Sequence, residues 1–440
     1  MPWACLGVVG WLAYLTAWGD YACAQKAPVP CPLPTSTNRS SDILTPQPGP
    51  DFTGCRLGPF DIQSRIATAV TYDDNILIAS QNPEADLIWS LQPALLAVAG
   101  DRTAIEDFQR TYHNVVRFSP DTFIITPQSD WPGKALMLDY GPRFNWFTTH
   151  TENDSIDQFL NFNALWPVSK IILGVRQEYV QQNATIIEAG RRTWQQTVPT
   201  ALMSGYQFSE KTTAEVNLSR TAVSYEQQQG LADYTDWNWA NWLNYQYSAC
   251  FNLGWGANFG ALELPSQPGQ VYEALMVRAR YLYGTRIILD GAFGLQLRQY
   301  EGGVPNTMAP VFNLVARYAA SESTVFHVTA FRRESPSVSS GYDYLSTGAA
   351  VGFQQRLGDR YFARLDLTCY TIDYLATSPA LIATEKAHQT DTYFEVRPAY
   401  EVQFSHHLFG SVFYLFRTLK ADQGAGWTDN QIGTRLTWTF

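Results

Sequence analysis

The sequence has little charge and, beyond its first residues, no long apolar run. Charged residues make up 16 % of the 440 positions, against the ~25 % usual for soluble domains. The longest clean apolar stretch after the amino terminus, 94–99, falls far short of the ~20 residues that a membrane-spanning helix needs. This excludes a helical membrane protein. The net charge of −10 argues against nucleic acid as a partner.

Residue patterns for common catalytic and metal chemistry are also missing. There are six histidines and no CxxCH, Walker-type or GxSxG motif. His406 and His407 fall in a predicted turn, and Asp73-Asp74 in the first external loop offers too few carboxylates for Ca²⁺. We therefore expect no metal, no cofactor and no catalytic residues. His113, His150 and His388 lie in or near loops.

Aromatic residues are abundant and exclude a disordered chain. The sequence holds 14 Trp, 24 Tyr and 24 Phe, far more than a disordered segment carries. Many aromatics, little charge and no apolar 20-mer together predict a transmembrane β-barrel, in which each strand shows only half of its residues to lipid.

The amino terminus reads as an export signal followed by a linker. Residues 1–24 contain an apolar stretch and the small-x-small site Ala22-Cys23-Ala24, although the positive n-region is missing. A buried hydrophobic helix is the alternative. Residues 25–57 are rich in proline and form a predicted periplasmic segment. Cys31 and Cys55 bracket most of it, and either form a disulfide or are two unrelated free thiols.

From residue 58 to 440 the chain alternates with period two, as half-buried strands do. In 429–440, for example, Ile432, Leu436 and Trp438 share one face while Gly433 and Arg435 share the other. Eighteen strands are predicted, or sixteen if one was split wrongly: 62–74, 86–99, 134–150, 157–168, 171–185, 194–208, 212–226, 236–249, 251–263, 271–283, 287–301, 310–320, 324–334, 343–357, 360–374, 391–405, 408–420 and 429–440.

Short turns and long polar loops alternate between these strands. This is typical of an antiparallel up-and-down barrel with periplasmic turns and external loops. An even strand number then places both ends of the barrel in the periplasm. The connection 100–133 breaks the rule, because it is long where a turn belongs. It forms either a constriction in the lumen or an extra periplasmic flap.

The final strand ends in Leu436, Trp438 and Phe440, which resembles the signal that the barrel-assembly machinery recognises. Three further stretches, 70–76 (VTYDDNI), 86–93 (DLIWSLQP) and 239–245 (WANWLNY), resemble a family of porin-like outer-membrane β-barrels of Gram-negative bacteria. The resemblance covers roughly 58–440. It implies an outer-membrane barrel of unspecified cargo, embedded in outer-membrane lipid, and no catalytic residues.

Arginine at the lipid midplane costs ~2–4 kcal/mol, so charged strand residues should face the lumen. Arg220 is the misfit, because it shares a face with apolar residues; it either snorkels or follows a bulge. Trp242, Tyr300 and Tyr370 are candidates for a sugar-stacking track or for packing. The residues predicted to line the pore are Arg143, Arg176, Arg278, Arg280, Arg298, Arg317, Arg333, Arg356, Arg364, Arg397, Arg435, Asp139, Glu178, Asp290, Asp366, Glu395 and Glu401.

The leading hypothesis is a passive outer-membrane channel for small polar or anionic solutes or oligosaccharides. A weak anion preference is expected, carried by residues such as Arg278 and Arg280, unless each arginine is bridged to a carboxylate, for example Arg176 to Glu178 and Asp139. The alternatives are a barrel that anchors or exports surface polysaccharide or docks a surface or periplasmic protein, and, more weakly, a barrel enzyme. A homo-oligomer is a further expectation.

Overall fold

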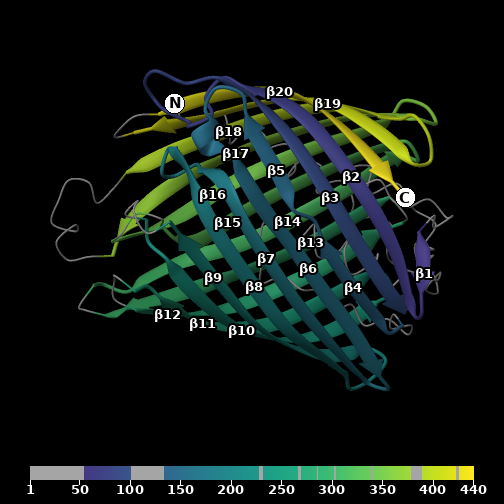
Figure 1. The fold of residues 1–440 in the computed structure, drawn as a ribbon. Helices are drawn as coiled ribbons and strands as arrows, with labels where there is room; N and C mark the ends of the chain where they lie inside the picture. The colour runs from purple at the N-terminus through teal and green to yellow at the C-terminus, as the bar shows by residue number, and fades with distance from the viewer. Residues whose placement is uncertain are drawn as a thin grey trace.

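The barrel consists of eighteen antiparallel strands (Figure 1). The computed structural model describes residues 54–100, 133–226, 231–265, 269–284, 286–301, 304–337, 339, 341–377, 389–422 and 426–440. Its elements are β1 (Cys55–Leu57), β2 (Phe60–Asp73), β3 (Asp86–Gly100), β4 (Ala135–Tyr140), β5 (Arg143–Phe147), η1 (Thr151–Asn153), β6 (Ser155–Val168), β7 (Ile171–Ile186), β8 (Arg191–Gln207), β9 (Thr212–Tyr225), β10 (Tyr234–Ser248), β11 (Phe251–Glu263), β12 (Gln270–Tyr283), β13 (Ile287–Tyr300), β14 (Thr307–Ser321), β15 (Thr324–Pro336), β16 (Tyr342–Arg356), β17 (Tyr361–Ala376), β18 (Thr390–Gln403), β19 (Leu408–Ala421) and β20 (Trp427–Thr439).

The sheet closes on itself, because β2 pairs with both β3 and β20. β4 and β5 are two halves of one barrel strand: both pair with β3 on one side and β6 on the other. The break falls at Gly141-Pro142, where proline has no N–H to offer the ladder. With β1 a short addition to β2, the count of eighteen is confirmed and the count of sixteen is wrong.

Connections alternate between the two ends of the barrel as predicted. One end, here the short-turn end, carries tight links such as 169–170 and 249–250, together with the start of β2 and the end of β20. The other, the long-loop end, carries links such as 74–85 and 377–389. The segments 1–53 and 101–132 lie outside the described residues. So do His113 and His388.

Two belts of aromatic side chains encircle the outward face. Near the short-turn end, Tyr361 of β17 stacks on Tyr400 of the neighbouring β18, and Trp438 stacks on Phe440 two positions further along the chain. Nearer the long-loop end, outward aromatics are exposed on several strands: Tyr72, Trp89, Trp146, Trp237, Trp239 and Tyr414. The outward residues between the belts are mostly apolar. This surface has the girdled apolar band of a transmembrane barrel.

No helix in the described part of the chain is long and apolar enough to cross a membrane.

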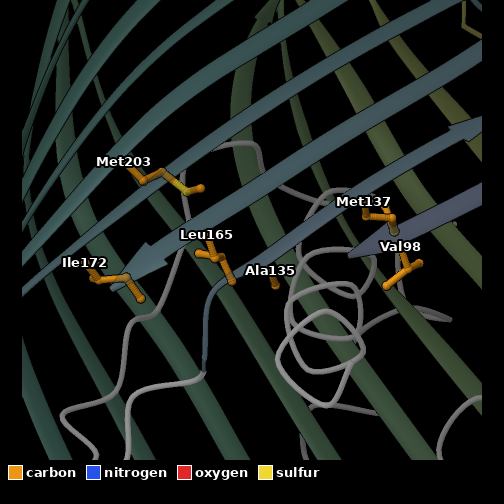
Figure 2. Close-up of a cluster of buried hydrophobic side chains, with 6 residues drawn as sticks. All are labelled: Val98, Ala135, Met137, Leu165, Ile172 and Met203. Atoms are coloured by element: carbon orange, nitrogen blue, oxygen red, sulfur yellow. The ribbon is translucent and has the colours of Figure 1, made fainter. Parts of the chain in front are cut away.

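One part of the inner wall is apolar, which the period-two pattern did not predict. At the short-turn end, six buried side chains from β3, β4, β6, β7 and β8 form a cluster on the inward face (Figure 2). Met137, which lies beside Val98, is fully buried. The members are Val98, Ala135, Met137, Leu165, Ile172 and Met203.

Two open questions from the sequence are settled. Cys55 lies exposed in β1 with a free thiol, so a Cys31–Cys55 disulfide is wrong and the free-thiol alternative holds for Cys55. Cys250 forms a disulfide. Arg220 faces outward without a bulge, because the β9–β10 register runs unbroken from Thr212 to Val223. Its guanidinium lies 5.4 Å from the Trp237 ring centroid.

The register at the seam can be tested by cross-linking. Thr68 and Leu436 are direct partners across β2 and β20, at a Cα separation that a disulfide can bridge. The double variant Thr68→Cys with Leu436→Cys should cross-link on oxidation, as shown by peptide mass analysis. Thr68→Cys with Arg435→Cys is the control and should not, since successive residues point to opposite faces. Equal cross-linking of both pairs would contradict the register.

Candidate functional site

Most arginines predicted to line the pore are bound to carboxylates on the inner wall. The N–O distances are 2.6 Å for Arg143–Asp157, 2.6 Å for Arg278–Glu215, 2.6 Å for Arg280–Asp290, and 3.3 and 3.2 Å for Arg298 with Glu334 and Asp343. Arg176 pairs with Glu178, and Arg364 with Asp366. The part of the inner wall that carries these pairs is therefore a buried polar core and not a row of unpaired cations.

These pairs are buried, so they belong to the packed interior of the barrel and are not available to a passing solute. The Arg278 and Glu215 side chains are 4 % and 5 % exposed, and Arg278 also donates to Asn244 Oδ1. The Trp242 ring centroid lies 4.3 Å from the Arg278 guanidinium. Such a pair contributes little net stability, but removing one member leaves a buried charge unmatched. Arg278 is therefore unsuited to attract a passing ion.

Two arginines differ from this pattern: Arg397 in β18 and Arg435 in β20. Both point inward and are nonetheless exposed to solvent. Within the described residues, neither forms a salt bridge. The Arg397 guanidinium lies 5.5 Å from the Phe413 ring centroid, and Arg435 Nη2 donates to Gln92 Oε1 at 3.2 Å.

The local backbone explains why these side chains stay free. Pro398 lacks an N–H, and the β18–β19 ladder is interrupted between Val396 and Ala399. Glu401 of β18 is the direct partner of Ser411 on β19, and Ser411 is the direct partner of Arg435 on β20. Glu401 therefore lies two strands away from Arg435. Asp366, the direct partner of Arg397 on β17, pairs with Arg364 instead.

These two arginines belong to a larger positive surface across the seam. Arg435 interacts electrostatically with Arg65, Arg143 and Arg397, and with one carboxylate, Glu401. Arg65 and Arg143 are about a third exposed, and each holds a carboxylate at 2.9 and 2.6 Å. We call Arg65, Arg143, Arg397 and Arg435 the arginine cluster. Its strands β2, β5, β18 and β20 lie around the closing seam.

The other predicted pore residues have more ordinary places. Asp139 binds Arg65 at 2.9 Å, not Arg176. Arg356 lies exposed at the short-turn rim, 3.2 Å from Asp359. Glu395 accepts the Tyr393 hydroxyl at 2.6 Å. Arg317 and Arg333 lie on the inward faces of β14 and β15, Arg317 opposite His327 and Arg333 beside the Phe331 ring.

The lumen aromatics pack instead of forming a track. Trp242 is covered by Arg278, and Tyr300 donates to Glu334 at 3.0 Å. Tyr370 and Tyr393 pack with their rings tilted by 32° and the ring centroids 4.8 Å apart. Of the histidines, His150 contacts Glu84 and Asp86, His327 lies 3.6 Å from Asp366, and His407 Nδ1 lies 3.1 Å from the Thr439 carbonyl oxygen.

Asp73 and Asp74 do not form a solvated turn. Asp73 is buried, and a third carboxylate, Asp429 of β20, joins them, with ligand-type atoms within 4.8 Å of one another. Neutral amides hold the first two: Asn75 N and Gln431 Nε2 donate to Asp73, and Asn430 donates twice to Asp74. Arg417 pairs with Asp429. The cluster ties the loop after β2 to the last strand.

The long-loop end is narrowed by the β7–β8 hairpin. Its tip, residues 182–194, has no ladder pairing with β6 or β9, because those ladders stop at Gln181 and Gln195. The tip leaves the wall and reaches strands far around the barrel. Arg417 donates to Thr185 Oγ1 at 3.1 Å, and Trp427 Nε1 donates to the Ile187 carbonyl at 3.4 Å.

A second hairpin meets this tip from the other side. The β14–β15 ladder stops at Arg332, and beyond it the β15–β16 hairpin sends Glu334 and Asp343 to Arg298. Ser337 then donates to Glu188 in the β7–β8 tip. An apolar core fills the junction: Ile78, Ile187, Tyr344, Tyr370, Tyr374, Ile372, Tyr393, Leu419 and Trp427. Sequence alone gave no sign of this inward packing, since the tip was expected to be an external loop.

Known proteins resemble the chain only distantly. No protein-family model matches it, and no curated protein matches it. Among solved structures, Acinetobacter baumannii OccAB4 aligns with a TM-score of 0.45 at 11 % identity, over 86 % of this chain and 98 % of that one. Pseudomonas aeruginosa OpdK with vanillate and OpdQ align with TM-scores of 0.45 and 0.44, each at 10 % identity over 86 % of this chain and 99 % of theirs. At this level the likeness assigns no residue a role.

The buried pair Arg278–Glu215 should matter for stability. Replacing one member, Glu215→Gln, should cost about 3–5 kcal/mol, because the Arg278 charge stays buried. The loss should appear as unfolding at lower urea concentration in detergent or lipid. Asp359→Asn, which removes the partner of the exposed Arg356, is the control and should leave the midpoint unchanged. Equal midpoints for both variants would show that the pair is not structural.

Proposed function

We propose that the protein is an outer-membrane channel that passes small anionic solutes along the arginine cluster. The supporting observation is that Arg397 and Arg435 face the lumen, are exposed, and form no salt bridge with a described residue. Barrels of sixteen to eighteen strands leave room for an aqueous channel. The outer belts and the apolar band between them suit a bilayer, and the export signal that the sequence predicts is consistent with the outer membrane.

Charge supports a preference for anions. Fixed cations in a narrow water-filled passage attract anions over the ~8 Å Debye length of physiological salt. The paired arginines elsewhere in the lumen contribute little to this field, because each is matched by a carboxylate. The selectivity therefore belongs to Arg397 and Arg435, and no longer to Arg278 and Arg280 as first expected.

Selectivity in a planar bilayer tests this proposal. Replacing both residues, Arg397→Gln with Arg435→Gln, should lower the anion-to-cation permeability ratio roughly two- to fivefold, since two unpaired charges leave the pore. The reversal potential in a salt gradient reports the ratio. Arg356→Gln, at the exposed rim, is the control and should leave it unchanged. An unchanged reversal potential in the double variant would reject the cluster as the selectivity site.

The packed long-loop end supports a second function, that of a barrel that anchors or docks a surface partner. The β7–β8 tip and the β15–β16 hairpin meet across the lumen, and a sealed lumen suits a structural role. The two functions differ in conductance, because only a channel passes ions. Absence of conductance in the wild-type protein would favour the structural role.

Shortening the β7–β8 tip separates these outcomes. Asn183 and Trp194 are direct partners, so a two-residue Asn-Gly turn can replace residues 184–193. Single-channel conductance should rise severalfold, because the tip and its apolar contacts leave the mouth. Glu188→Gln, which keeps the hairpin, is the control and should stay close to wild type. An unchanged conductance in the shortened variant would show that the tip does not limit flow.

A further inference from the structure

Four adjacent strands carry polar residues in one register row on the lipid-facing side of the wall. Gln158 of β6 faces Gln181 of β7, Gln181 faces Gln196 of β8, and Gln196 faces Ser224 of β9. With strands ~4.8 Å apart, the row is about 14 Å wide. We call Gln158, Gln181, Gln196 and Ser224 the rim row.

The rim row faces outward and marks the upper edge of the wall. Its members share faces with the exposed residues Trp166, Leu173, Leu202 and Leu218. Directly beyond Gln181 and Gln196 the β7–β8 tip turns into the lumen, as the end of both outer ladders shows. The row therefore lies where the apolar band gives way to the polar surface at the long-loop end.

A cation lies just below the rim row. Arg220 sits four positions before Ser224 on the same outward face of β9, backed by the Trp237 ring at 5.4 Å. Along the outward faces of β6–β9, from the rim row to the short turns, it is the one charged side chain among the described strand residues. No carboxylate there can neutralise it, and an arginine at lipid depth needs an anion or water at the interface.

Two amides of the rim row, Gln181 two strands and Gln158 three strands from Arg220, are oriented by tyrosines. Tyr140 Oη donates to Gln158 Oε1 at 2.7 Å, and Tyr179 Oη donates to Gln181 Oε1 at 2.9 Å. Both carbonyl oxygens are thus engaged. Within the described part of the chain, the Nε2 groups of these two glutamines have no acceptor. A pair of outward N–H donors and one outward cation therefore remain available at the rim.

We propose that the rim row and Arg220 bind the headgroup of a phosphorylated glycolipid in the outer leaflet. Arg220 contacts a phosphate, for which a guanidinium is well suited, and the glutamine amides donate to sugar hydroxyls. Charge complementarity favours this occupant, because Arg220 is an outward cation with no carboxylate on the outward faces of β6–β9. A second copy would have to offer it Glu263 or Glu273, which are exposed on the outward faces of β11 and β12, and the dimer outcome of the test separates the two. The inference rests on the proposed outer-membrane location, but not on channel activity.

Native mass spectrometry of the full chain in detergent tests the inference, with diphosphorylated lipid A as the probe. Arg220→Gln should weaken binding on the order of tenfold, the loss of one charge-assisted hydrogen bond. Lys211→Gln, at the short-turn end beside the same strand, is the matched control and should bind as wild type. With dephosphorylated lipid A, wild type and Arg220→Gln should bind equally weakly. Gln181→Leu with Gln196→Leu should weaken binding of both lipids.

Several results would overturn the inference. Equal binding of lipid A by Arg220→Gln and wild type would remove Arg220 from the site. Displacement of the lipid by millimolar inorganic phosphate would show a free-anion site, and an Arg220-dependent dimer would show a contact between copies. Heat-modifiable mobility confirms that each variant is folded. Bilayer conductance of Arg220→Gln should equal wild type, so a failure of the channel proposal is seen separately.

Discussion

The structure depends on one constraint: no backbone N–H or C=O can face lipid without a partner. A sheet meets it only by closing, and the pairing of β2 with β20 closes this one. Closure then gives each strand one face toward lipid and one toward the lumen, and successive residues alternate between the two. The aromatic belts, the inward arginines and the outward rim row all follow from that division.

The inward face must solve a second problem, because an eighteen-strand barrel encloses more space than side chains of one wall can fill. Here the solution differs from sector to sector. Buried arginine–carboxylate pairs fill the space beside β7 and β9–β13, an apolar cluster lines part of the short-turn end, and inward-folded hairpins narrow the long-loop end. Arg397 and Arg435 stay exposed and form no salt bridge with a described residue, so the candidate site is defined as much by missing partners as by the arginines themselves.

The sequence predicted the strands and their faces well because period two is a local property. The strand 429–440 is an example: its alternation places Arg435 inside and Trp438 outside, as observed. Which arginine is paired depends on register between strands distant in the chain, and this has no local signal. Asp139 was expected near Arg176 and binds Arg65 instead. Asp429 lies beside Asp73 across the seam. Only the two neighbouring carboxylates, Asp73 and Asp74, could be counted from the sequence, so this third one was missed. The inward turn of residues 182–194 was missed for the same reason, since its partners lie on β16, β19 and β20.

The seam also has a kinetic consequence. Asp74 and Asn430 are bonded across 356 positions of sequence, whereas the other pairs of neighbouring barrel strands are consecutive in the chain. The entropy cost of bringing ends together grows with the length of the intervening chain, and topologies dominated by such distant contacts form slowly. The hairpins can therefore assemble one after another while the two edges stay unpaired, and an unpaired strand edge is a template for aggregation. Closure is then the last and slowest step, and the edges of β2 and β20 need protection until it occurs.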